Sequence, residues 1–274
     1  MTSGPAQPDG PGAGAGPIVV LDDVHKSFDG QPVLDGVSLA LQRGKTTVVI
    51  GPSGCGKSVL MKHIVGLLRP DRGRVFFDGT EITHLSERQL VPFRRRVGFL
   101  FQSGALFDSM PVEENIQFPL IESGVRSSAE LNRRTSEVLH VVGLDGTQRK
   151  YPEELSGGQK KRVALARAIA LNPEVLLYDE PTTGLDPIRA DLINELILKL
   201  KAELKTTALA VTHDIDSARK VADRIVMLYK GKLVADTPPE GLMDITDGAV
   251  ARFVQGRATP EELSQLRTGR VKQG

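Results

Sequence analysis

The sequence predicts an α/β fold with a mixed or parallel sheet, helices on both faces, an antiparallel β edge and an inserted helical subdomain. Short apolar, β-branched runs such as 48–50, 175–178 and 208–211 have the character of buried strands, and helical apolar faces alternate with them. A glycine-rich segment joins the first of these runs to a helix. Between 103 and 150 the strand pattern gives way to helices and loops.

The glycine-rich segment Gly51–Ser58 has the spacing G-x-x-x-x-G-K-S and follows a predicted strand. Its glycines allow the backbone to curl until successive N–H groups point inward as an anion nest, and the N-terminus of the next helix adds positive potential. Lys57 supplies a full positive charge for terminal phosphates, and the Ser58 hydroxyl is suited to Mg²⁺. The segment therefore predicts a phosphate-binding loop.

Length and composition limit the possible classes of protein. The chain has 274 residues with a formal net charge of +1, which fits one large domain and gives no strong field for nucleic acid. The single cysteine, Cys55, is either a redox switch beside a nucleotide or a tolerated small residue, and we favour the second interpretation. Residues 1–17 are rich in Gly, Pro and Ala and are expected to be a disordered leader. No apolar run is long enough to span a bilayer.

The N-terminal part predicts the antiparallel edge. Ile18–Val24 and Val33–Leu41 are expected strands, and Arg74–Phe77 is another after the helix that begins near Ser58. Phe28 lies beside the Asp29-Gly30 turn, upstream of the phosphate loop. It is either an aromatic platform for adenine or a core residue of an edge strand.

Polar side chains follow three predicted strands directly. Gln102 ends the strand 97–101, Asp179 and Glu180 end 175–178, and His213 follows 208–211. Because ligands bind beyond the carboxyl ends of parallel strands, these residues are expected at one site. Asp179 and Gln102 are suited to Mg²⁺, Glu180 to accepting a proton from an attacking water, and His213 to a hydrogen bond with a γ-phosphate.

A second glycine pair precedes a helix. Leu155, Ser156, Gly157, Gly158 and Gln159 lead into a predicted helix over 160–171, which makes another backbone anion site. Upstream, Ser127-x-x-Glu130 is a predicted capping box. Downstream, Pro187 is expected to open a long helix.

Several polar residues are interpreted as solvent-exposed. His63 and His84 have no ligand partners at suitable spacing and are expected on the surface. The basic run Lys160, Lys161 and Arg162 is interpreted as a solvated helix face.

Taken in order, these motifs resemble the nucleotide-binding subunit of ABC transporters across residues 18–240, with a P-loop NTPase core. The resemblance implies ATP and Mg²⁺ as cofactors, and a head-to-tail homodimer in which each ATP lies between the P-loop of one subunit and the signature of the other. It implies that Glu180 and His213 are catalytic and that Asp186 belongs to the D-loop. The implied ATP-binding residues are Phe28, Gly51, Pro52, Ser53, Gly54, Cys55, Gly56, Lys57 and Ser58. The implied signature is Leu155, Ser156, Gly157, Gly158 and Gln159, and the implied Mg²⁺ ligands are Ser58, Gln102 and Asp179.

The sequence of Leu100–Leu120, together with residues 184–188 and 252–256, also resembles the Mla/Mce cassettes that move phospholipids or other lipids between membranes. That resemblance implies an MlaE-like multipass permease docking near the Q-loop, an MCE-domain substrate-binding protein, and a place on the cytoplasmic face of the inner membrane. The ATPase of another importer, for example for polar amino acids, is the alternative. A single cassette without a heptad run argues against ABC proteins of translation or DNA repair.

The predicted organisation has three parts. Residues 1–17 form the leader, 18–240 the nucleotide-binding domain with a helical subdomain at about 103–165, and 241–274 a partly disordered C-terminal extension.

Overall fold

The computed structural model describes residues 16–246 and 248–258. Nearly all of the predicted leader, and residues 259–274 of the predicted extension, lie outside the described residues. Within the described part, no helix combines the length and the apolar character that crossing a membrane requires.

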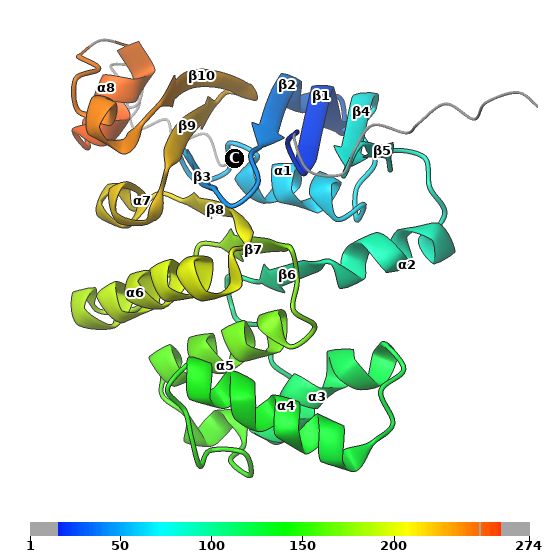
Figure 1. Ribbon diagram of the computed structural model, residues 1–274. Helices are drawn as coiled ribbons and strands as arrows, with labels where there is room; N and C mark the ends of the chain where they lie inside the picture. The colour runs from blue at the N-terminus through cyan, green and yellow to red at the C-terminus, as the bar shows by residue number, and fades with distance from the viewer. Residues whose placement is uncertain (1–15, 247, 259–274) are drawn as a thin grey trace, which may run out of the picture.

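The strands form two sheets, and the predicted α/β class is confirmed (Figure 1). The six-stranded sheet has the order β10-β9-β3-β8-β7-β6 and is parallel except for the β9–β10 hairpin. The four-stranded sheet has the order β2-β1-β4-β5 and is the predicted antiparallel edge. The strands are β1 (Val19–Phe28), β2 (Gln31–Leu41), β3 (Thr46–Ile50), β4 (Arg72–Phe77), β5 (Thr80–Glu81), β6 (Val97–Leu100), β7 (Val175–Asp179), β8 (Thr207–Thr212), β9 (Arg224–Tyr229) and β10 (Lys232–Thr237).

The helices lie in separate groups around the sheets. Figure 1 shows α3, α4 and α5 together at the end of the molecule away from the four-stranded sheet, with α6 beside α5; α5 packs directly against β6. The α-helices are α1 (Lys57–Ile64), α2 (Glu87–Arg95), α3 (Val112–Glu122), α4 (Ser128–Val141), α5 (Gly157–Ile169), α6 (Pro187–Leu204), α7 (Ile215–Val221) and α8 (Gly248–Val254). Two short 3-10 helices are η1 (Pro152–Glu154) and η2 (Pro239–Leu242).

Two hydrophobic clusters hold these layers together. One joins the antiparallel sheet to a face of the six-stranded sheet through α1, which contributes Leu60, Met61 and Ile64. The other joins the opposite face of the six-stranded sheet to α3–α7. Strand β3 is buried along its whole length because it supplies residues to both clusters. The phosphate-loop strand is therefore fixed from both sides.

Local signals explain where several helices begin and end. The Asp186 carboxylate accepts a hydrogen bond from Arg189 N–H at 3.0 Å, and Pro187 occupies the first turn, so α6 begins as predicted. The Ser127 hydroxyl accepts from Glu130 N–H at 3.4 Å at the start of α4. Helix α1 is shorter than its apolar pattern predicts, since the chain turns at Gly66, whose φ is 65°.

The chain beyond residue 240 continues to pack against the nucleotide-binding part. Leu242 in η2 and Val250 in α8 are buried in the cluster that contains α5 and α6. The division at 240 and the limits of the helical subdomain remain predictions. Helix α5 itself runs on to Ile169, past the predicted limit of about 165.

The prediction that His63 lies on the surface was wrong. His63 is only 1% exposed on α1, its Nδ1 lies 2.7 Å from the Val59 carbonyl oxygen, and its Nε2 is buried without a partner among the described residues. Burial lowers the pKa of His63 below its ordinary value. The side chain is on the face of α1 that packs inward, where a lone histidine is uncharged. His84 is exposed, as predicted.

We expect this buried histidine to make the fold less stable in mild acid. The unfolded chain takes up a proton at His63 near pH 6.5, whereas the folded protein resists it, so the free energy of unfolding falls as the pH drops below that value. One pH unit below it, the contribution reaches at most about 1.4 kcal/mol. Urea unfolding of wild type and His63→Gln at pH 7.5 and 5.5 measures the effect. A pH dependence unchanged in His63→Gln, or reduced equally in His84→Gln, contradicts the prediction.

Candidate functional site

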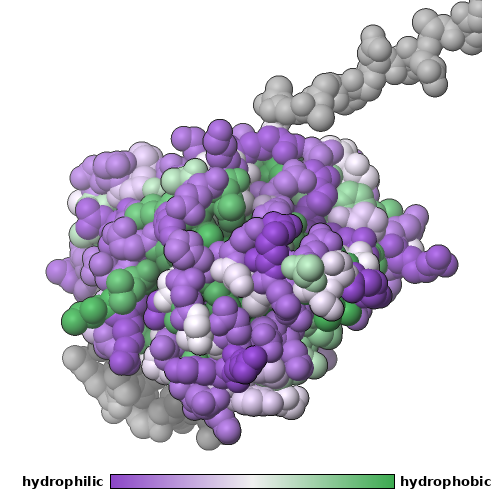
Figure 2. Space-filling model, turned by 60° about the horizontal axis from the view of Figure 1, so that its bottom comes forward, coloured by the Kyte–Doolittle hydropathy of each residue, from purple (hydrophilic) through white to green (hydrophobic). Residues whose placement is uncertain are grey.

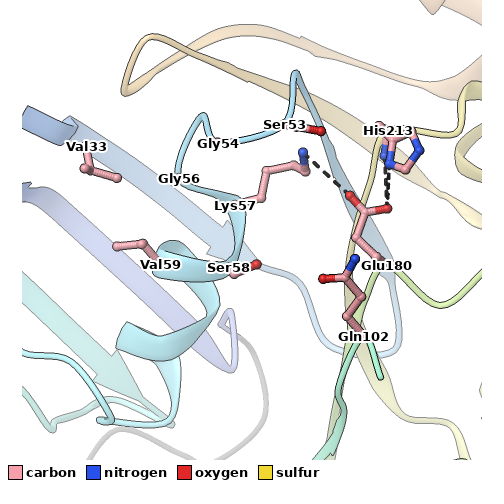
Figure 3. Close-up of a pocket in the computed structure, with 10 residues that line it drawn as sticks. All are labelled: Val33, Ser53, Gly54, Gly56, Lys57, Ser58, Val59, Gln102, Glu180 and His213. Carbon is pink, nitrogen blue, oxygen red and sulfur yellow. Dashed lines mark hydrogen bonds and ion pairs between the residues drawn. The ribbon is translucent and has the colours of Figure 1, made fainter. Parts of the chain in front are cut away.

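The loop between β3 and α1 curls around a pocket and depends on its glycines (Figure 3). Gly56 has φ 105°, and a Cβ there would lie 3.0 Å from the Val33 carbonyl oxygen. Gly51 has φ 154°, and a Cβ there would lie 2.3 Å from the Leu228 carbonyl oxygen. Side chains are therefore excluded at both ends of the loop, by backbone conformation and by close packing. The loop has the form that the phosphate-binding pattern predicts.

Strand register brings the predicted polar residues to this loop. Ile50 of β3 pairs with Thr212 of β8, Val211 pairs with Asp179 of β7, and Tyr178 pairs with Leu100 of β6. The carboxyl ends of these parallel strands are thus level with one another. Residues from five chain segments line a pocket of about 450 Å³: Val33, Ser53, Gly54, Gly56, Lys57, Ser58, Val59, Gln102, Glu180 and His213.

Lys57 is buried at the centre of this pocket. Its ammonium donates to the carbonyl oxygens of Gly51 at 2.7 Å and Pro52 at 3.0 Å, and lies 3.7 Å from Glu180 Oε1. Figure 3 shows the Lys57 side chain reaching across the pocket toward Glu180. A charged group held inside the loop by backbone carbonyl oxygens is placed to attract the oxygens of a phosphate chain.

Ser58 and Asp179 meet where a divalent cation would bind. The Ser58 hydroxyl donates to Asp179 Oδ1 at 3.1 Å, and Gln102 lines the same pocket. Burial raises the pKa of Asp179, and the neighbouring Glu180 carboxylate raises it further. The described residues contain no group of three or more His, Cys, Asp or Glu that forms a cage for a metal. One carboxylate and one hydroxyl fit Mg²⁺, which completes its shell with water and substrate phosphates.

Glu180 is held on both its backbone and its carboxylate. Its φ of 48° is left-handed, and its N–H donates to the Val211 carbonyl oxygen at 2.9 Å. Glu180 Oε2 lies 2.9 Å from His213 Nδ1 and accepts from the Thr183 hydroxyl at 3.1 Å. A strained backbone held this firmly is typical of functional positions. The contribution of Thr183 was not found from the sequence, since its hydroxyl reaches Glu180 only through the turn that the fold makes.

Phe28 ends β1 and does not line the pocket. Its side chain is 42% exposed, with Lys26 Nζ 5.5 Å from the ring centroid. It is therefore not a buried core residue, and its place beside adenine remains a prediction. Val33, which the sequence did not single out, lines the pocket instead. Gly51, Pro52 and Cys55 belong to the loop without lining the pocket. Burial raises the pKa of the Cys55 thiol, which does not favour a reactive thiolate.

The glycine pair at the start of α5 lies outside the phosphate-loop pocket. Ser156 caps the helix by accepting from Gln159 N–H at 3.3 Å, and a Cβ on Gly157 would lie 3.8 Å from Leu185. The segment Leu155–Gln159 therefore packs beside the turn that contains Asp186. None of its residues lines the pocket. Within one chain, the two predicted anion sites do not meet.

The basic run after this segment is only partly a solvated face. Lys161 is 6% exposed, and its ammonium donates to the carbonyl oxygens of Gln102 and Glu180. Arg162 donates to the carbonyl oxygens of Val142 and Gly143. The prediction was therefore wrong for Lys161. The position of Lys161 in the helix did not indicate its burial, because only the fold brings the strand ends against α5.

Known proteins are similar to this chain in sequence and in fold. The family model described as "ABC transporter" matches residues 34–183. The "Probable ribonucleotide transport ATP-binding protein mkl" of Mycobacterium tuberculosis is 41% identical over 242 residues, covering 88% of this chain and 67% of that protein. The "Intermembrane phospholipid transport system ATP-binding protein MlaF" of Haemophilus influenzae is 39% identical over 226 residues, covering 82% and 86%. The "Methionine import ATP-binding protein MetN" of Brucella abortus is 39% identical over 264 residues, covering 96% and 71%.

A solved structure agrees with these relatives. The ATP-binding cassette MJ0796, dimeric and bound to ADP and Pi in a post-hydrolysis state, is 35% identical with a TM-score of 0.75, over 81% of this chain and 98% of that one. The phosphate loop, Gln102, Asp179 and Glu180 lie within the residues 34–183 that the family model matches. This chain belongs to the ABC transporter family and is an ATP-binding, ATP-hydrolysing subunit of a transporter.

Proposed function

We propose that two copies of this chain bind two ATP molecules between them, each ATP lying between the phosphate loop of one copy and Leu155–Gln159 of the other. The support is the separation of the two anion sites within one chain. A second copy, placed head to tail, supplies the missing half of each site. Two half-sites of positive potential are joined by the charge of ATP, so binding closes the pair and loss of the γ-phosphate opens it.

In this mechanism Lys57 and the loop N–H groups bind the phosphate chain. Glu180 accepts the proton of the attacking water, while His213 and Thr183 hold its carboxylate in place. A bound Mg²⁺, held by Ser58, Asp179 and Gln102, would supply positive charge to the phosphate oxygens. The pocket walls fix the orientation of the phosphates.

A groove beside Gln102 carries our proposal for coupling to a membrane permease. The groove measures about 460 Å³ and lies between β6, α3 and α5. The ring centroids of the stacked Phe99 and Phe101 are 4.1 Å apart, and those of Phe107 and Phe118 are 4.9 Å apart. Its residues are Arg94, Val97, Gly98, Phe99, Phe101, Ala105, Phe107, Phe118, Pro119, Arg167, Ala168 and Leu171. Figure 2 turns the helical end forward and shows hydrophobic side chains interrupting a mostly hydrophilic surface. An aromatic groove of this kind accepts an amphipathic cytoplasmic helix.

The cargo we propose is lipid, with phospholipid first, moved between membranes. Two observations support it: the likeness to MlaF, which is named for phospholipid transport, and the apolar character of the sequence Leu100–Leu120. The complex would then contain an MlaE-like multipass permease and an MCE-domain protein. The ATPase would lie at the cytoplasmic face of the inner membrane, attached through the permease.

A second candidate cargo is an amino acid. The likeness to MetN, which is named for methionine import, extends over 96% of this chain and favours it. Purification of the full chain from native membranes, followed by identification of co-purifying proteins and lipids, separates the two. An MCE-domain protein with bound phospholipid supports lipid transport. A periplasmic amino-acid-binding protein, or ATPase activity stimulated by an amino acid and not by phospholipid, supports the alternative.

We expect Phe118→Asp to weaken attachment to the permease. The side chain is 39% exposed in the groove, so a charge there is tolerated by the folded chain but is costly under an apolar helix. The yield of permease pulled down with the chain should fall at least about 10-fold, the factor that a loss of about 1.4 kcal/mol produces. Val234→Asp places the same charge on exposed β10, away from the groove, and should leave the yield unchanged. Equal yields for the two variants would contradict docking at this groove.

A further inference from the structure

One buried ammonium connects the helix that begins at the signature with the strand ends of the hydrolytic site. Lys161 lies one turn into α5, and its Nζ donates to the carbonyl oxygen of Gln102 and, at 3.3 Å, to that of Glu180. The three residues belong to α5, to the chain after β6, and to the turn after β7. Segments far apart in the sequence are thus held by one side chain.

This cation is costly to bury and is satisfied by backbone oxygens. Lys161 is 6% exposed, and burial lowers its pKa although Asp179 and Glu180 lie nearby. Its hydrogen-bonding partners are the two carbonyls rather than a carboxylate. A surface lysine at this point of the helix would avoid the cost of desolvation. The position is therefore better explained by what the ammonium holds than by a contribution to folding.

Both carbonyls belong to residues whose direction matters for hydrolysis. The backbone at Glu180 is left-handed with φ 48°, a conformation unfavourable for glutamate, and its carbonyl also accepts from Thr183 N–H at 3.3 Å. A charged donor on that carbonyl fixes the turn that directs the Glu180 carboxylate toward Lys57 and His213. The same donor fixes where the chain leaves β6, and hence where the Gln102 side chain enters the pocket.

We propose that Lys161 is a positioning residue, which makes α5, Gln102 and Glu180 move as one unit. This inference rests on the proposed pairing of two copies. Because α5 begins with the segment that would contact the partner's ATP, a shift of α5 when that ATP binds is transmitted through Lys161 to Glu180 of its own site. Each ATP would then set the geometry for hydrolysis of the other.

The test compares Lys161→Met, which keeps the apolar stem and removes the donors, with Lys161→Arg, which keeps charge and donors. Lys160→Met is the matched control, since Lys160 is the adjacent, more exposed residue and its side chain makes no hydrogen bond or ion pair within the described part of the chain. The full chain is assayed for ATP turnover, its Hill coefficient, and affinity for a fluorescent ATP analogue under conditions that keep it monomeric. For Lys161→Met we expect turnover to fall at least 10-fold, the Hill coefficient to fall toward one, and monomer affinity to change less than 2-fold. Lys161→Arg should recover part of both losses.

A purely structural role would lower thermal stability and analogue affinity together and leave the Hill coefficient unchanged, and that result overturns the proposal. Turnover equal to that of Lys160→Met also overturns it. If Lys161→Met is unfolded at the assay temperature, Lys161→Gln serves with the same expectations. A second measurement does not depend on turnover. The double variant Lys161→Met/Glu180→Gln is compared with Glu180→Gln alone, and light scattering follows dimer formation as the ATP concentration rises. We expect the ATP concentration at half-maximal dimer formation to rise at least 5-fold in the double variant, and an unchanged value counts against the proposal. If Glu180→Gln alone forms no ATP-dependent dimer, the proposed pairing itself has failed.

Discussion

Glu180→Gln is expected to bind ATP with nearly unchanged affinity, to accumulate as an ATP-bound dimer and to lose hydrolysis by about 10²–10⁴-fold, the range that general-base catalysis contributes. The substitution keeps the size of the side chain and still offers an oxygen to His213 Nδ1, now 2.9 Å from Oε2. It removes the negative charge that accepts the proton of water. It also removes the carboxylate 3.7 Å from Lys57. Because a carboxylate makes no favourable contact with the phosphates of ATP, its removal does not weaken their binding.

Phosphate release under saturating ATP measures the loss, and size-exclusion chromatography with and without ATP measures the trapped dimer. Glu203→Gln removes an exposed carboxylate from α6 and serves as the control with normal turnover. Hydrolysis that continues at the normal rate in Glu180→Gln would show that another group accepts the proton. An inactive variant that stays monomeric with ATP would instead argue against the proposed pairing.

Lys57→Ala is expected to abolish productive nucleotide binding. The ammonium is held by the Gly51 and Pro52 carbonyls inside the loop, so little conformational entropy is lost when phosphate oxygens replace them. A charge-assisted hydrogen bond contributes about 1.5–3 kcal/mol, and affinity for ATP should fall at least about 10–150-fold.

Isothermal titration with ATP compares this variant with Lys62→Ala, which removes an exposed lysine from the same helix. Affinity retained in Lys57→Ala would contradict the assigned phosphate cradle. A loss of similar size in Lys62→Ala would show that general positive potential, rather than the position of Lys57, governs binding. Circular dichroism of both variants checks that the fold is retained, because Lys57→Ala also removes the ammonium that lies 3.7 Å from the buried Glu180 carboxylate.

The phosphate loop illustrates what sequence reasoning captured. A backbone that must take positive φ and must pass within van der Waals contact of Val33 and Leu228 accepts only glycine, so the spacing of Gly51 and Gly56 is visible in the sequence. Likewise, a carboxylate or histidine directly after a fully apolar run indicates a strand end. Parallel pairing then brings such ends to one edge, which is why Gln102, Glu180 and His213 line one pocket.

Histidine and lysine at helical positions illustrate what it missed. His63 and Lys161 lie on helices whose polar and apolar residues are mixed. The residues around each of them in the sequence do not reveal which face of the helix packs inward. On α6, Leu192 is 56% exposed, whereas its apolar neighbour Ile193 is 1% exposed. In each case the packing of distant elements determined the exposure.

By itself, the sequence determined the α/β class, the phosphate loop and the order of the polar strand ends, because these depend on local backbone geometry and on the alternation of apolar runs. Only the tertiary structure decided that Lys161 joins α5 to Gln102 and Glu180, that Thr183 holds the Glu180 carboxylate, and that aromatic rings gather in a groove beside Gln102. Those contacts join residues that the chain brings together only after its sheets and helices have packed, and no short-range pattern specifies them.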